Sequence, residues 1–232
     1  MSANLSLEEL QRNRKKICSQ IDEDGVIDYI FRQIGTQPLK MFVEVGISPC
    51  VVSSDPRRGL LEGNTVHLRN NGWVGWMIDG VKQDEQFGIN KAFITPENIG
   101  TTLTALGVPK TLDLFSLDID SLEYYVLKEF LKEFKPRVVI SEYNCIYDDK
   151  RAVSRTVDFN WKDDLFGVSG NLLKELMAEN GYTMVHTNRV NAFFVRNDEL
   201  SDECKLSFAS LAPEIWPLYP ITSKESNWMI IK

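Results

Sequence analysis

The stretch from Leu112 to Asn144, LDLFSLDIDSLEYYVLKEFLKEFKPRVVISEYN, decides the fold class. Residues 112–117 form a compact apolar run, which is typical of a buried strand. Residues 122–134 carry apolar side chains at helical spacing, and residues 137–141 form a second buried strand. Strand, helix and strand at this spacing predict a βαβ unit, and therefore a parallel sheet with its crossover helix on one face.

The same alternation continues on both sides of this unit. Further strands are expected at 40–45, 73–78 and 92–94, and a closing hairpin at 182–186 and 192–196. Helices are expected at 5–21, with Ser6 and Glu9 as a capping box, then at 25–34, 63–71 and 172–180, with another starting at Thr95-Pro96. We therefore predict an α/β, Rossmann-like protein with a seven-stranded, mostly parallel sheet, helices on both faces and a C-terminal antiparallel hairpin.

We expect one domain over residues 1–232. In it, residues 1–37 form N-terminal helices, residues 38–200 the Rossmann-like core, and residues 201–232 a tail that packs on the core or on an oligomer interface. A length of 232 residues with 43% hydrophobic residues allows one sizeable core.

Composition narrows the range of partners. The formal net charge is −7, so the chain lacks the basic footprint of a nucleic-acid-binding protein, and a small-molecule or sugar substrate fits better. No apolar run reaches the ~18 residues that cross a membrane. The four cysteines form no CxxC pair, and the N-terminus is polar. We expect reduced thiols in a cytoplasmic protein.

Carboxylates follow four of the expected strands. They are Glu44, Asp79, the pair Asp118 and Asp120, and Glu142, which Asn144 accompanies. Because ligands bind at the carboxyl ends of parallel strands, these groups point to one site. Gly46 would let the backbone approach a nucleotide-type cofactor, and Asp79 matches the acid that holds ribose hydroxyls. Asp118, Asp120, Glu142 and Asn144 suit a hard cation. Asp118 and Asp120 could instead cap the helix that follows, and without a metal one of the three carboxylates would rise in pKa and could be a general base.

Two histidines and several aromatic residues complete the candidates. His67 falls on an expected helix and is interpreted as structural. His186 ends a strand near the ligand edge and is a candidate general base. Trp161 lies in a loop rich in charge, and with Tyr143 and Tyr147 it would give the pocket aromatic walls that suit a carbohydrate.

The order of motifs resembles FkbM-type methyltransferases. The resemblance runs from residue 40 to 196 and rests on these stretches: FVEVG (42–46), GNT (63–65), GWVGWMIDG (72–80), TPENI (95–99), DLFSLDID (113–120), PRVVISEYN (136–144), FGVS (166–169), GY (181–182) and NAFFV (191–195). It implies a class I methyltransferase fold, S-adenosylmethionine as donor and an oxygen acceptor, often on a sugar. One departure stands at Gly46-Ile47-Ser48-Pro49, where a second glycine or an Asp-Gly pair is usual.

The resemblance also implies roles for single residues. Similarity to sugar O-methyltransferases of antibiotic pathways makes Asp118, Glu142 and Asn144 the expected ligands of a possible Mg²⁺ or Mn²⁺, with Asp120 in reserve. Glu44 and Gly46 would line the methionine end of the cofactor and Asp79 its ribose, and Asn64 and Asp118 are further cofactor-binding candidates.

The function expected from these residues is metal-assisted methylation of a sugar hydroxyl on a glycan or glycoside, with Asp118, Asp120 and His186 as catalytic candidates. Two alternatives stay open: an enzyme that uses another nucleotide cofactor, and a non-catalytic protein that has kept the fold. The partners expected are a small molecule or glycan, with no nucleic acid and no membrane. The chain could also form a homo-oligomer or be a module of a larger glycan-building protein.

Overall fold

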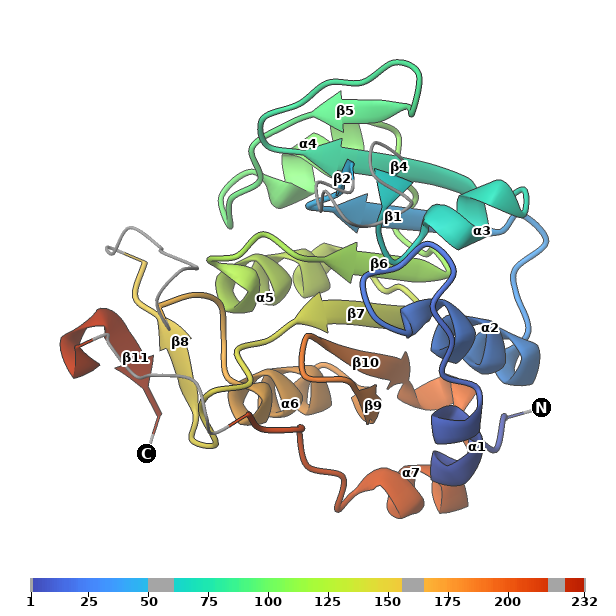
Figure 1. Ribbon diagram of the computed structural model, residues 1–232, viewed down its shortest axis with the longest axis vertical. Coiled ribbons are helices and arrows are strands. Elements are labelled where there is room, and N and C mark those ends of the chain that lie inside the picture. Colours follow the sequence, from blue (N-terminus) through green and yellow to red (C-terminus); the bar gives the residue numbers. More distant parts are fainter. Residues whose placement is uncertain (1, 50–60, 156–164, 217–223, 232) are drawn as a thin grey trace.

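A seven-stranded sheet forms the centre of the computed structural model, which describes residues 2–49, 61–155, 165–216 and 224–231 (Figure 1). Its strand order is β5-β4-β1-β6-β7-β10-β9. The bounds are β1 Met41–Val45, β4 Val74–Asp79, β5 Ile89–Lys91, β6 Leu114–Leu117, β7 Val138–Glu142, β9 Tyr182–Thr187 and β10 Asn191–Arg196. The first five strands pair in parallel, whereas β10 runs antiparallel to both β7 and β9.

Helices cover both faces of this sheet, because successive side chains of the buried strands point into two different cores. Phe42 and Leu114 lie in a core with residues of α1, α2, α3 and α7, whereas Val43 and Phe115 lie in a core with residues of α4, α5 and α6. The helix bounds are α1 Leu7–Arg12, α2 Glu23–Ile34, α3 Val66–Asn70, α4 Ile99–Ala105, α5 Glu123–Glu133, α6 Gly170–Glu179 and α7 Asp202–Phe208. Two short 3₁₀ helices span Asn197–Glu199 and Glu225–Asn227.

The topology is that of an open, Rossmann-like α/β sheet. Chain order runs outward from β1 through β4 to β5, then returns to the other side of β1 and continues through β6 and β7. The last strand, β10, then enters antiparallel between β7 and β9. The predicted fold class is therefore confirmed, and the reversal of strand order lies beside β1, where open α/β sheets bind ligands.

The N-terminal helix is shorter than predicted. Ser6 caps it as expected, since its hydroxyl accepts the N–H of Glu9 at 3.5 Å. The helix ends at Arg12 rather than at residue 21, because the Asp24 carboxylate binds the backbone N–H groups of the following loop. Such side-chain acceptors compete with helical hydrogen bonds.

The third predicted strand is displaced along the chain. Strand β5 ends at Lys91, and residues 92–94, where a strand was expected, leave the sheet after the Ala92 N–H bonds to the Asp79 carbonyl. Thr95 does not start the next helix directly. A turn closed by the Asn98 side-chain oxygen on the Thr95 N–H comes first, and α4 begins at Ile99.

Two small antiparallel pairs lie outside the main sheet. Strand β2 (Ser48–Pro49) pairs with β3 (Leu61–Glu62), so the chain after Gly46 turns into a short ladder. Strand β8 (Arg151–Val153) pairs with β11 (Trp228–Ile230) from the C-terminal tail, over a separate apolar cluster that includes Tyr147 and Leu165. Among the described residues, no helix has the length and apolar character needed to cross a membrane.

Candidate functional site

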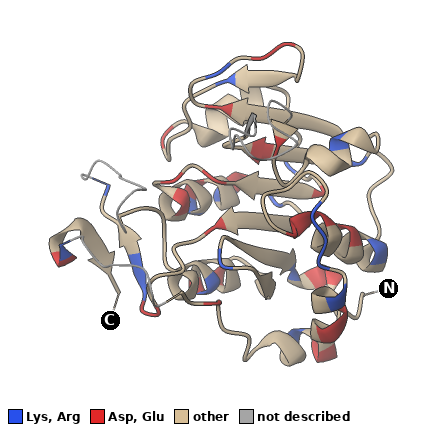
Figure 2. Cartoon of the chain, in the orientation of Figure 1, with Lys and Arg blue, Asp and Glu red and all other residues tan. Residues whose placement is uncertain are grey.

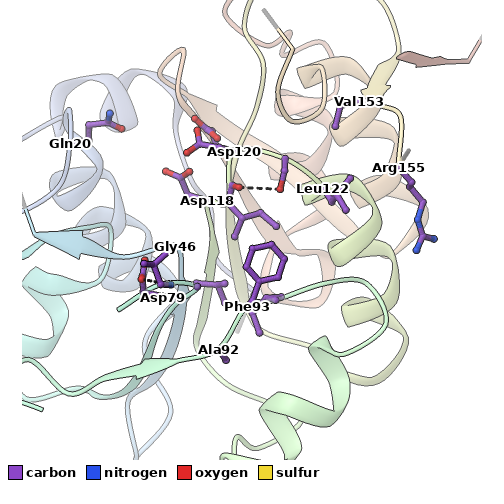
Figure 3. A pocket seen from close by; sticks show the side chains of 17 residues that line it. Gln20, Gly46, Asp79, Ala92, Phe93, Asp118, Asp120, Leu122, Val153 and Arg155 are labelled. Carbon is purple, nitrogen blue, oxygen red and sulfur yellow. Dashed lines mark hydrogen bonds between the residues drawn. The ribbon is translucent and has the colours of Figure 1, made fainter. Parts of the chain in front are cut away.

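A cavity of about 750 Å³ opens at the carboxyl ends of β1, β4, β6 and β7. Asp and Glu residues lie at these strand ends (Figure 2). Figure 3 shows Asp118 and Asp120 near the middle of the cavity, with Asp79 and Phe93 on one side. The residues that line it are Gln20, Val45, Gly46, Asp79, Gly80, Val81, Ala92, Phe93, Ile94, Asp118, Ile119, Asp120, Ser121, Leu122, Glu142, Val153 and Arg155.

Three carboxylates form a group that fits a metal ion. Asp118 and Asp120 follow β6, and Glu142 ends β7. One oxygen of each lies within 4.8 Å of the others, and all three side chains are half-buried. Carboxylate oxygens are the ligands that Mg²⁺ and Mn²⁺ prefer, so this donor set suits a hard divalent cation.

Glu123, the first residue of α5, holds the loop that carries two of these carboxylates. Its Oε1 accepts the N–H of Ile119 at 2.9 Å and that of Ser121 at 3.1 Å. Between them, Asp120 adopts a left-handed backbone with φ of 55°. The sequence analysis missed Glu123, although an acid in the first turn of a helix is the usual acceptor for such loop donors.

Burial and mutual repulsion raise the pKa values of the acids in the site. Burial, followed by the charges of Asp120 and Glu123, raises the pKa of Asp118 to about 8. Burial and the charge of Asp118 raise the pKa of Glu142 well above its ordinary value, and burial raises the pKa of Glu123 to about 7. Without a cation, the group therefore keeps protons at neutral pH, and a bound divalent cation would release them.

Beside the acids, the cavity has a face suited to a nucleoside. Asp79 ends β4, and its Oδ1 accepts the N–H groups of Val81, at 2.8 Å, and Lys82. Val81 and Phe93 are apolar cavity residues that are nonetheless 75% and 72% exposed. Exposed apolar side chains beside a carboxylate can take the flat face of a base and the hydroxyls of its sugar. Val81 and Phe93 were not singled out from sequence, because exposure cannot be read from it.

Gly46 is required by the close approach of two strand ends. Its φ is +95°, and a Cβ at this position would lie 1.4 Å from the Asp118 carbonyl oxygen. The chain after β1 thus passes directly against the chain after β6, and the space above it stays open. The prediction that Gly46 lies at the ligand edge agrees with its place in the cavity wall.

Glu44 and Asn64 line a small side cavity of about 130 Å³ that shares Gln20, Gly46 and Asp118 with the main one. Glu44 is buried, and its two oxygens accept the N–H groups of Asn64 at 2.7 Å and Thr65 at 3.0 Å, together with the Thr65 hydroxyl. The Asn64 amide donates to Ser116 Oγ at 3.0 Å. Burial raises the pKa of Glu44 to about 7. Glu44 therefore shapes the side cavity by fixing the chain that leads into α3.

The structure separates Asn144 and His186 from the acid group. The Asn144 oxygen accepts the Ile146 N–H at 3.0 Å, and its amide donates to the Phe166 carbonyl at 3.0 Å, so this side chain holds a turn instead of completing the predicted ligand set. His186 is buried on β9, at the sheet edge, with the Phe193 ring 5.3 Å away. Burial lowers the pKa of His186 to about 4, which makes it a poor base in addition to a remote one.

Two of the three predicted aromatic wall residues, Tyr143 and Tyr147, do not line the cavity. The Tyr143 hydroxyl donates to the Glu214 carbonyl at 2.8 Å, and the Tyr147 ring packs 5.0 Å from Trp228, so both anchor the C-terminal tail and neither lines the cavity. Trp161 lies outside the described residues. Among the described residues, Leu122, Val153 and Arg155 line the cavity near the start of α5, and the guanidinium of Arg155 pairs with Glu97.

His67, interpreted as structural, lies on α3 with its Nε2 3.2 Å from an Asp28 oxygen. This contact joins α3 to α2 away from the cavity.

Comparison with known proteins gives fold-level likeness only. No family model and no curated protein matches the sequence. Among solved structures, two crystal forms of the MycE methyltransferase from the mycinamycin biosynthetic pathway, each in complex with Mg and SAH, are similar to this chain. Crystal form 1 has 17% identity and a TM-score of 0.49 over 85% of this chain and 57% of the other. Crystal form 2 has 15% identity and a TM-score of 0.47 over 91% of this chain and 61% of the other. This chain thus spans less than two thirds of the length of either structure.

Proposed function

We propose that this protein is an S-adenosylmethionine-dependent O-methyltransferase that uses a divalent cation and acts on a sugar hydroxyl. The observation that carries the proposal is the position of the Asp118, Asp120 and Glu142 carboxylates. They lie in the same cavity as the nucleoside face formed by Asp79 and Phe93, at the carboxyl edge of the sheet. A cavity with these two features can hold a nucleoside cofactor and a cation side by side.

The nucleoside face would bind the adenosine part of the cofactor. Asp79 would accept hydrogen bonds from the ribose hydroxyls, while Val81 and Phe93 would contact the adenine. The remainder of the cofactor would pass over Gly46, where a side chain is excluded. S-adenosylmethionine carries a positive sulfonium, and a cavity lined by four carboxylates favours it over a neutral or anionic ligand.

The acid group would hold the cation through Asp118 and Glu142, with Asp120 in place of the amide expected at Asn144. When bound, a divalent cation supplies Lewis acidity that lowers the pKa of a substrate hydroxyl. The protein's own residues orient the acceptor and receive its proton. Asp120 is our candidate for that role, because burial raises its pKa and it faces the cavity.

The acceptor would enter beside Leu122, Val153 and Arg155, which lie across the cavity from Gln20 (Figure 3). Methyl transfer needs the acceptor oxygen in line with the breaking carbon–sulfur bond, so holding both ligands in one cavity supplies most of the catalysis. The FkbM-type subgroup and the sugar acceptor remain parts of this proposal that rest on the sequence motifs.

Calorimetric titration of S-adenosylmethionine, with and without Mg²⁺ or Mn²⁺, tests the proposal. We expect saturable binding and methyl transfer to sugar acceptors that depends on the cation. Asp118→Ala should abolish transfer, whereas Asp202→Ala, which removes the same group from a fully exposed site on α7, should not. Absence of binding under every metal condition would favour a non-catalytic protein or another cofactor.

A further inference from the structure

The segment between α1 and α2 reaches the cavity although it belongs to none of the strand ends. Gln20, in the middle of this segment, lies in the wall of both the main cavity and the side cavity. Its side chain is exposed and makes no hydrogen bond to the described part of the chain. In the view of Figure 3, Gln20 and Arg155 lie at opposite sides of the cavity.

A buried carboxylate holds the loop that carries Gln20. Asp24, 1% exposed in the first turn of α2, accepts the N–H groups of Ile17 and Cys18, both at 2.7 Å, and of Ser19 at 2.8 Å. The same oxygen accepts the Ser19 hydroxyl at 2.7 Å. Four donors on one carboxylate oxygen fix the backbone directly before Gln20, because hydrogen bonds to a charged group are strong.

Further polar contacts tie this loop to the site. Asn188 donates to Asp22 at 2.9 Å and to Glu23 at 2.8 Å, which joins the segment to the β9–β10 turn. The Cys18 carbonyl accepts the N–H of Gly63 at 3.3 Å, beside the side cavity. Buried hydrogen bonds therefore fix the exposed Gln20 at one point of the cavity wall. Packing of the core alone would not require a glutamine at this position.

We infer that Gln20 binds the amino-acid end of the cofactor, so that the N-terminal segment is part of the ligand site. This inference rests on the proposed function. With the nucleoside held by Asp79 and Phe93, the opposite end of the ligand passes Gly46 and meets the side cavity, which Gln20 borders. A primary amide can donate to the α-carboxylate and accept from the α-ammonium, which are the two groups found at that end.

The test compares two ligands that differ only at this end. S-adenosylhomocysteine carries the amino-acid group, whereas 5′-methylthioadenosine keeps the nucleoside and the thioether without it. In calorimetry on the full chain, Gln20→Ala should lower the affinity for S-adenosylhomocysteine about tenfold, the value of one hydrogen bond to a charged group. The affinity for methylthioadenosine should stay unchanged. Gln33→Ala, an exposed glutamine on α2 outside the cavity, is the matched control and should change neither ligand.

Ser19→Ala removes one of the four donors on Asp24. It should also lower the affinity for S-adenosylhomocysteine, but by less than Gln20→Ala does. If the wild-type protein binds S-adenosylhomocysteine and Gln20→Ala changes both ligands equally or neither, the inference is overturned and the proposed function stands. If the wild-type protein binds neither ligand, the proposed function fails and this inference fails with it.

Discussion

Charged side chains are paired at the amino end of the parallel sheet and crowded together with like charges at its carboxyl end. At the amino end, the buried Arg137 guanidinium pairs with Asp113 at 2.9 Å and Glu199 at 2.7 Å, and it donates to the Ile34 carbonyl at 2.8 Å. At the carboxyl end, Asp118, Asp120 and Glu142 crowd together, and the one basic side chain among the described cavity residues, Arg155, is paired with Glu97.

This difference separates structure from function. Paired charges join the end of α2 and the 3₁₀ helix after β10 to the sheet, so the amino end stabilises the fold. Crowded like charges destabilise a metal-free protein, and their raised pKa values are what burial without a counter-charge produces. Such unfavourable groups persist where a ligand requires them, which is why perturbed acids in a cavity indicate a site. Six substitutions, two of them controls, and one pH dependence test this contrast.

The largest effect is expected at the amino end. Arg137→Met leaves Asp113 and Glu199 without their partner, and breaking a buried ion pair costs about 3–5 kcal/mol of unfolding free energy. Urea denaturation measures it. Arg12→Met removes an exposed arginine that pairs with Glu8 and Glu9 on α1, and it should cost no more than ~1 kcal/mol. Similar losses in both variants would contradict a special role for the amino end.

Gly46→Ala tests how closely the carboxyl ends of β1 and β6 approach. The added Cβ would meet the Asp118 carbonyl, so we expect a loss of roughly 2–4 kcal/mol from overpacking and left-handed strain together. Gly72 has a similar φ of +80°, but a Cβ added there would have nothing within 4 Å. Gly72→Ala should therefore show the left-handed strain alone, a loss of about 1–2 kcal/mol of unfolding free energy. Equal losses in thermal denaturation would refute the clash with Asp118.

The same substitution should have opposite signs at the two ends. Asp113→Asn removes a buried charge that accepts from Arg137 and from the N–H groups of Gln37 and Met41, and we expect a loss of about 1–3 kcal/mol. Asp118→Asn relieves repulsion, so the metal-free protein should gain up to about 1 kcal/mol while its Mn²⁺ affinity, measured by titration, falls at least about tenfold. A destabilised Asp118→Asn protein with unchanged Mn²⁺ affinity would remove the metal site from the proposal.

The last prediction is a pH dependence of the stability of the metal-free protein. The pKa is raised to about 7 for Glu44 and Glu123 and to about 8 for Asp118, so the folded chain keeps protons that the unfolded chain releases near pH 4. Their contribution to stability is complete below pH 4 and is lost as pH rises through 7 to 8. In EDTA, Tm should therefore fall as the pH rises from 5 to 8.5. Asp118→Asn should flatten the curve, and a Tm that rises with pH would contradict the assignment.

The local sequence pattern was sufficient to predict most strands of the sheet and the carboxylates at its edge. The apolar runs at residues 41–45, 114–117 and 138–142 are buried strands because they have no polar face to expose. Asp79, Asp118 and Glu142 follow from the rule that parallel strands end at one edge. The short strand β5 was misplaced, since three residues carry too little periodicity to locate.

The sequence by itself therefore determined the fold class and the edge of the sheet that carries the site. Only the tertiary structure decided which polar groups at that edge are free to act. Asn144 is used by the backbone of its own turn, whereas Asp120 faces the cavity. Gln20 reaches the cavity on a loop where the spacing of apolar residues predicted a helix. The loop forms because the buried Asp24 carboxylate binds backbone N–H groups just before Gln20. Hydrogen bonds between distant segments follow from three-dimensional proximity, which the spacing of residues along the chain does not contain.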